Sequence, residues 1–122
     1  MRKLLLFALI GLISLLSANA QAQSKECLQP VDQQMFQQSL TELAETDFQE
    51  ERMELVDKLI ASYCLSTKQV KALIMQFDFE DIKLQIAEKA FNKTVDKANF
   101  LLIKEAFEFD ESIAKLSLIT QN

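Results

Sequence analysis

The chain repeats one pattern three times: an amphipathic stretch, a short acidic and aromatic segment, and a second amphipathic stretch. The short segments end in Phe48, Phe79 and Phe109, which stand 31 and 30 residues apart. A period of roughly 20 to 50 residues is typical of stacked repeats, each of which buries its apolar face only against its neighbours. The repeat therefore predicts an all-α domain of three stacked helical hairpins, an α–α superhelix.

The N-terminal residues have the features of a secretory signal peptide. Arg2-Lys3 precedes an almost wholly apolar run from Leu4 to Leu16, and small residues follow, ending at Ala20. The run has 13 residues, whereas a helix needs about 20 to cross a bilayer. We expect cleavage after Ala20, with Ala22 as the alternative site, and export to the periplasm or the extracellular medium.

The sequence then predicts three parts: a signal peptide over 1–20, a short N-terminal lead over 21–32, and a single helical-repeat domain over 33–122. After cleavage, 11 basic residues face 18 acidic ones, a net charge of −7. This charge disfavours nucleic acid and anionic membrane surfaces. We also expect no stable membrane insertion after the signal peptide is removed. The chain has no His, and its one Gly lies in the signal peptide. We therefore expect no cofactor and no metal site.

Apolar residues recur at helical spacing in all three repeats. The run from Val70 to Phe77 places them at i, i+3, i+4 and i+7, on one face of a helix. Asp32, Ser66 and Asp96 each stand four residues before the first apolar core position of a hairpin, where an N-cap is expected. The predicted helices lie near 33–45, 50–63, 67–77, 80–92, 97–107 and 110–119.

Three segments resemble a known family, the domain of unknown function 4476, which occurs on small exported bacterial proteins. They are Ser66-Thr67-Lys68-Gln69-Val70, Phe77-Asp78-Phe79-Glu80-Asp81-Ile82-Lys83-Leu84, and Asp96-Lys97-Ala98-Asn99-Phe100 with the later Phe107-Glu108-Phe109. The resemblance extends from Phe36 to the C-terminus. The family has a Lys or Arg four residues after the marker Phe. Arg52 and Lys83 match it, but Ile113 stands in the third repeat. The resemblance implies no activity.

The two cysteines suggest a disulfide bond in an exported chain. Cys27 precedes the first predicted helix and Cys64 follows the second, and an antiparallel hairpin brings those ends together. The bond would close a loop of 38 residues and stabilise the fold by about 4 kcal/mol in the chain-entropy estimate. Two free thiols, or pairing with another molecule, are the alternatives.

Acidic residues gather around the three turns inside the hairpins. If the hairpins stack in parallel, these turns line one side of the array, which we call the turn edge. The acids there either complement the dipoles of helix N-termini and aid solubility, or form a docking surface for a basic partner or a weak divalent cation. The candidate docking residues are Asp47, Glu50, Glu51, Asp78, Glu80, Asp81, Glu108, Asp110 and Glu111.

The phenylalanine pairs at two of the turns, Phe77 with Phe79 and Phe107 with Phe109, are expected to close the end of the core. Exposing a large apolar side chain forfeits roughly 1.5–3 kcal/mol. The alternative is that these rings form an exposed ligand clamp.

These features favour a binding module of the cell envelope over an enzyme, with another protein as the partner. The alternative is a small envelope hydrolase or carbohydrate-acting protein. Its acid and base would be paired carboxylates such as Glu50 with Glu54, or Asp78 with Asp81.

Overall fold

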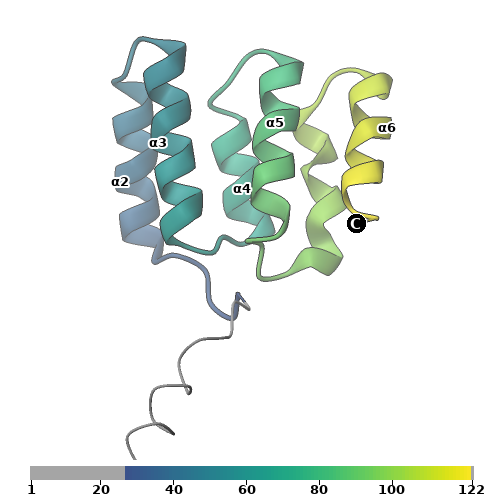
Figure 1. The fold of residues 1–122 in the computed structure, drawn as a ribbon, viewed down its shortest axis with the longest axis horizontal. Coiled ribbons are helices and arrows are strands. Elements are labelled where there is room, and N and C mark those ends of the chain that lie inside the picture. Colours follow the sequence, from purple (N-terminus) through teal and green to yellow (C-terminus); the bar gives the residue numbers. More distant parts are fainter. Residues whose placement is uncertain (1–26, 122) are drawn as a thin grey trace, which may run out of the picture.

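The computed structural model describes residues 27–121. The predicted signal peptide and both cleavage sites lie outside the described residues. Within residues 27–121, six helices follow one another (Figure 1). They are α2 (Gln33–Ala44), α3 (Gln49–Ser62), α4 (Thr67–Ile74), α5 (Glu80–Phe91), the 3₁₀ helix η1 (Lys97–Ala106) and α6 (Asp110–Ile119).

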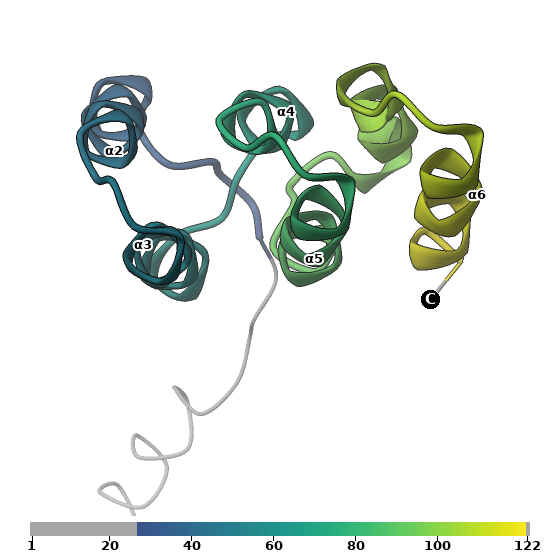
Figure 2. The same cartoon turned by 90° about the horizontal axis from the view of Figure 1, so that it is seen from above.

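The helices form three antiparallel hairpins, as predicted, and the hairpins stand side by side in two layers. Figure 2 shows α2, α4 and η1 in one layer and α3, α5 and α6 in the other. Neighbouring hairpins contact each other through α3 with α5, α4 with η1, and α5 with α6. The three turns inside the hairpins lie together at the top of Figure 1, so they form the turn edge expected for hairpins that stack in parallel. The segments that join one hairpin to the next lie on the opposite side, the connector edge.

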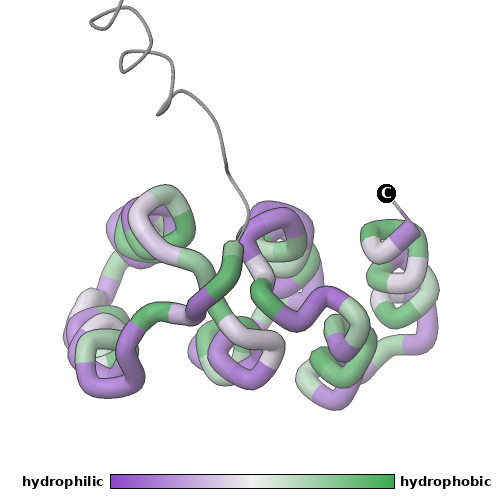
Figure 3. Tube along the Cα trace, turned by 90° about the horizontal axis from the view of Figure 1, so that it is seen from below, coloured by the Kyte–Doolittle hydropathy of each residue, from purple (hydrophilic) through white to green (hydrophobic). Residues whose placement is uncertain are grey.

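The core lies between the two layers and contains residues from all three hairpins. Val70, Leu73 and Ile74 of α4 and Ile86 of α5 are fully buried. Each helix carries both hydrophobic and hydrophilic segments (Figure 3), as expected for amphipathic helices that bury one face. The middle hairpin has a neighbour on each side and packs against both.

Two of the three predicted N-caps act as expected. The Asp32 carboxylate accepts hydrogen bonds from the backbone N–H groups of Gln34 and Met35. Ser66 and Gln69 form the reciprocal capping box that begins α4.

The third prediction is wrong, because Asp96 caps a different helix from the one expected. The Asp96 side chain makes no cap hydrogen bond to its own helix. It accepts instead from the backbone N–H of Thr67 at 2.8 Å and from the Thr67 hydroxyl at 3.0 Å, so it caps α4 of the preceding hairpin. Partial burial acts to raise the pKa of Asp96, but the hydrogen bonds from Thr67 and Asn99 outweigh it and hold that pKa below its usual value.

The fifth helix also differs from the prediction, because it is a 3₁₀ helix and not an α-helix. Its buried residues are Phe100, Ile103 and Ala106, spaced by three. A 3₁₀ helix has three residues per turn, so this spacing places all of them on one line against α4. Leu101 and Leu102, between them, are exposed.

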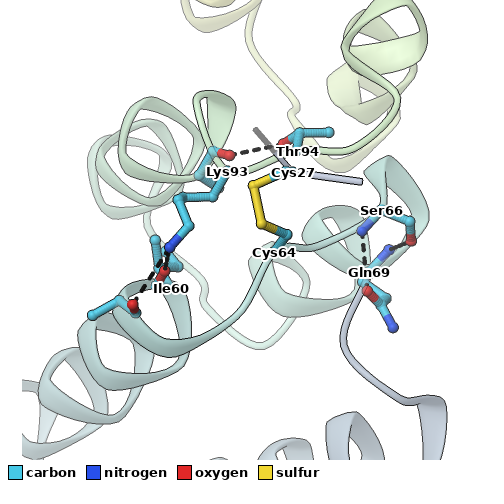
Figure 4. Close-up of a disulfide and its surroundings, with 9 residues drawn as sticks. Cys27, Ile60, Cys64, Ser66, Gln69, Lys93 and Thr94 are labelled. Carbon is cyan, nitrogen blue, oxygen red and sulfur yellow. Dashed lines mark hydrogen bonds between the residues drawn. A yellow bond between two sulfur atoms is a disulfide. The ribbon is translucent and has the colours of Figure 1, made fainter. Parts of the chain in front are cut away.

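The connector edge is held by a disulfide bond and a chain of backbone hydrogen bonds. Cys27 and Cys64 are joined, with their Cα atoms 5.6 Å apart, as predicted (Figure 4). The backbone N–H of Val31 donates to the Cys64 carbonyl at 2.8 Å, and that of Leu65 donates to the Lys93 carbonyl at 2.8 Å. The first connector is therefore bonded to the N-terminal lead, and the second connector is bonded to the first. The Lys93 amine also donates to the Ile60 carbonyl at 2.6 Å, near the end of α3.

Candidate functional site

The turn edge presents the same residue in the same backbone geometry three times. Phe48, Phe79 and Phe109 are the N-cap residues of α3, α5 and α6, with φ of −96°, −96° and −105° and ψ of 135°, 133° and 137°. The N-terminal ends of these helices form a row along the top of the array (Figures 1 and 2). The three rings therefore occupy equivalent positions, one on each hairpin.

The three phenylalanines lie on the surface, which corrects the expectation that Phe79 and Phe109 close the core. Phe48, Phe79 and Phe109 are 69%, 66% and 59% exposed. Phe77 and Phe107 are buried, as expected. The extended backbone at the N-cap explains the difference, because a residue there has left the helix and no longer follows its 3.6-residue phase. The exposed rings are thus a surface feature and not part of the core.

Phenylalanine is a poor residue for the N-cap position. A side-chain oxygen there accepts a hydrogen bond from an unpaired N–H of the first turn, and its loss costs about 0.5–2 kcal/mol. Asp32 and Ser66 supply that oxygen at the starts of α2 and α4. The helices that begin at the turn edge have no side-chain cap hydrogen bond. The first helices of two hairpins are therefore capped, whereas the second helices of all three are not.

Carboxylates flank each ring in a fixed order. An acidic residue stands directly before each phenylalanine and another stands two residues after it, giving the pattern acid–Phe–x–acid in every hairpin. All six of these acids are exposed: Asp47 and Glu50, Asp78 and Asp81, and Glu108 and Glu111. Glu51 and Asp110 are exposed as well. The turn edge therefore combines apolar rings with a concentrated negative charge.

Glu80, the ninth predicted docking residue, has a different role. Its carboxylate accepts hydrogen bonds of 3.2 Å from the backbone N–H groups of Glu108 and Phe109 in the next hairpin. Burial acts to raise the pKa of Glu80. The Ser112 hydroxyl, the two N–H groups and the Lys83 charge outweigh burial and hold that pKa below its usual value. Glu80 thus fixes the third turn against the second hairpin and is not free to dock a partner.

Arg52 joins the first hairpin to the second beneath the turn edge. Its guanidinium group donates to the carbonyl oxygens of Leu43 at 3.2 Å and Gln76 at 2.7 Å. The guanidinium carbon lies 4.5 Å from the centroid of the Phe77 ring, a cation–π contact. Arg52 therefore satisfies carbonyl groups near the ends of α2 and α4 at once.

Lys83 occupies the corresponding position in the second hairpin. Its buried amine donates to the Ala106 carbonyl at 2.8 Å, at the end of η1, and lies 3.6 Å from the Glu80 carboxylate. Ile113 takes this position in the third hairpin, the last within residues 27–121, and it packs against the core. The cation four residues after the marker phenylalanine thus links each hairpin to the next. The family resemblance pointed to this position, and the hydrogen bonds show its structural role.

The carboxylates considered for a hydrolase lie open to solvent. Glu50, Glu54, Asp78 and Asp81 are all exposed, so no low-dielectric environment surrounds them. Among residues 27–121, no three or more His, Cys, Asp or Glu side chains are placed to hold a metal ion. No helix in the same part of the chain is long and apolar enough to cross a membrane. What the turn edge offers chemically is contact: apolar surface for anchoring and charge for attracting a cationic partner.

The family model for DUF4476, described as a domain of unknown function, matches residues 30–120. No curated protein and no solved structure matches the chain.

Proposed function

The chain belongs to the DUF4476 family, and we propose that it is an exported protein-binding module of the cell envelope. Its turn edge docks a basic protein partner. The partner contacts Phe48, Phe79 and Phe109 with apolar groups, and Lys or Arg side chains face the surrounding carboxylates.

The three exposed phenylalanines carry this proposal. Each ring gives up much of the roughly 1.5–3 kcal/mol that full burial of such a side chain contributes. Each also occupies an N-cap where a polar residue would stabilise the helix. A residue that departs from two stability rules at once marks a functional position. Here the departure recurs at three equivalent positions.

The composition of the surface indicates the kind of partner. Aromatic side chains are enriched at protein interfaces, where a few of them dominate the binding energy. Exposed charges around such anchors act mainly on the rate and selectivity of association. The acid–Phe–x–acid pattern therefore favours a partner that presents apolar and positively charged side chains together.

The turn edge is also held in place before any partner arrives. Arg52 and Lys83 bond successive hairpins together, and Glu80 holds the third turn. A surface that is already ordered loses little conformational entropy on binding. The disulfide between Cys27 and Cys64 supports the export part of the proposal, because such bonds persist in oxidising compartments.

The proposal is tested by capture from envelope extracts of the exporting cell, followed by binding of the purified partner at several salt concentrations. The turn variant is Phe48→Ser, Phe79→Ser and Phe109→Ser combined. The control combines Leu28→Ser, Leu102→Ser and Leu118→Ser, which remove three exposed apolar side chains outside the turns. We expect the control to retain the partner and the turn variant to lose it. We also expect association with the native protein to slow steeply as salt is added.

A second pair of variants tests the charges. Asp47→Asn, Asp78→Asn and Glu108→Gln neutralise one equivalent acid in each turn. Their control combines Glu42→Gln, Asp57→Asn and Glu88→Gln, with the same change in net charge outside the turns. We expect slower association for the turn variant alone. Equal capture by the phenylalanine variant and its leucine control, or association that salt leaves unchanged, would contradict the proposal.

A further inference from the structure

The three docking positions are equivalent, and this equivalence indicates the form of the segment that they bind. Building on the proposed function, we infer that the turn edge binds one extended segment of its partner. That segment places an apolar side chain on each ring, at every third residue, with basic residues between.

The spacing of the helices sets the step of the segment. Phe48, Phe79 and Phe109 begin α3, α5 and α6, and each of these helices packs against the next. Packed helices lie about 8–10 Å apart, so successive N-caps are separated by about the same distance. A polyproline II segment rises about 3.1 Å per residue with three residues per turn. Every third side chain of such a segment therefore points in the same direction, and successive side chains of this set are about 9.3 Å apart.

The acids that recur at equivalent positions on every hairpin agree with this three-residue step. Two acids flank each phenylalanine at equivalent positions, such as Asp78 and Asp81 around Phe79, and all of them are exposed. A segment with one apolar residue in three has two remaining residues for each step. If both are Lys or Arg, every hairpin can pair two acids with two cations around one apolar contact.

A helical partner fits this surface less well. Amphipathic helices carry three to four apolar residues in every seven, on one continuous face. The turn edge offers one ring for each hairpin, with exposed carboxylates on both sides of it. A continuous apolar face laid along this row would cover carboxylates with apolar groups and leave them unpaired. An extended segment avoids that cost.

Three equivalent contacts also predict how the binding energy is divided. Each ring alone forms a weak contact. When one segment links the three contacts, the second and third form within the same complex, and the overall affinity rises far above that of a single contact. We therefore expect the three phenylalanines to contribute alike. No single ring should dominate, in contrast to an interface with one central anchor.

The test uses labelled synthetic peptides and the purified protein. The periodic peptide repeats Leu-Lys-Lys three times, and the clustered peptide has the same composition with the three leucines together. We expect the periodic peptide to bind at least about tenfold more tightly. We expect Phe48→Ser, Phe79→Ser and Phe109→Ser, made singly, to weaken it by similar factors, and Leu118→Ser to leave it unchanged. A third, longer peptide carries leucines on one helical face.

The outcomes separate this inference from the proposed function. If both nine-residue peptides bind equally and both are lost in the triple phenylalanine variant, the docking surface stands and the three-residue period is wrong. The same holds if the helical peptide binds best, or if one ring alone accounts for the loss. If the triple variant binds every peptide as the native protein does, both the period and the docking surface are wrong.

Discussion

Arg52 of the first hairpin donates a hydrogen bond of 2.7 Å to the carbonyl oxygen of Gln76 in the second. Lys83 repeats this relationship one hairpin further on, with the Ala106 carbonyl at 2.8 Å. The two bonds run beneath the turn edge and point in the same direction along the chain. They couple the positions of the three exposed rings to the stability of the whole array.

Replacing either cation should therefore destabilise the protein. Hydrogen bonds to charged groups contribute about 1.5–3 kcal/mol, and a buried carbonyl left without a donor is costly. We expect Arg52→Met and Lys83→Met each to lower the free energy of unfolding by about that amount in urea titrations. Lys68→Met, at an exposed position, serves as the control and should change it by less than about 0.5 kcal/mol. Equal effects at all three positions would mean that the inter-hairpin bonds add nothing.

Replacing an exposed phenylalanine should have the opposite effect. In Phe79→Ser, the new hydroxyl can cap α5, a gain of about 0.5–2 kcal/mol. The ring is 66% exposed, so its removal loses only a fraction of the roughly 1.5–3 kcal/mol of full burial. We expect thermal unfolding to show a protein as stable as the native form, or more stable by up to about 1 kcal/mol. A marked loss of stability would place the ring in the core.

The disulfide should act as one unit. Cys27→Ser should lower the free energy of unfolding under oxidising conditions by about 2–4 kcal/mol. Adding Cys64→Ser should change it little further, because the bond is already gone. Mass measurement before and after reduction should differ by two hydrogens. Losses that add across the two substitutions would mean that the cysteines act separately.

Stability should fall in acid, because the folded state lowers the pKa values of Glu80 and Asp96 below their usual values of 4.5 and 3.8. A group with a lowered pKa stabilises the fold above its unfolded-state pKa and loses that contribution as pH falls through the folded-state value. We therefore expect the free energy of unfolding to decline below about pH 4.5. Urea titrations between about pH 2 and 7 should show a smaller decline for Glu80→Gln and Asp96→Asn. An unchanged acid decline in both variants would contradict these assignments.

The architecture could be predicted because it depends on patterns that repeat. The stripe from Val70 to Phe77 and the capping box at Ser66 indicate a helix by local physics. The structure confirms this helix as far as Ile74, and Phe77 is buried beyond its end. The pairing of Cys27 with Cys64 was predicted from two cysteines in an exported chain and from the hairpin that brings them together, and the structure contains this bond. These features depend on spacing along the chain, which the sequence states directly.

The candidate site was harder to predict, because it depends on the residue at which each helix begins. Phe79 stands three residues before Ile82, in phase with the core of α5, and phase alone places it inside. Its extended backbone at the N-cap turns the ring outward. The roles of Glu80 and Asp96 were missed for another reason. Both bind a neighbouring hairpin about 29 residues away, and local patterns do not report such contacts.

Ile113 gives the array a direction. Each of the first two hairpins reaches forward to its successor with a cation, and the third ends this series with an apolar residue that packs against its own core. A longer member of this architecture is therefore most simply made by duplicating the middle hairpin in place, because that unit carries a carbonyl that accepts from the hairpin before it and a cation that donates to the hairpin after it. A hairpin appended after Ile119 would meet an end without a donor, so lengthening the protein from that side requires a new Lys or Arg at position 113.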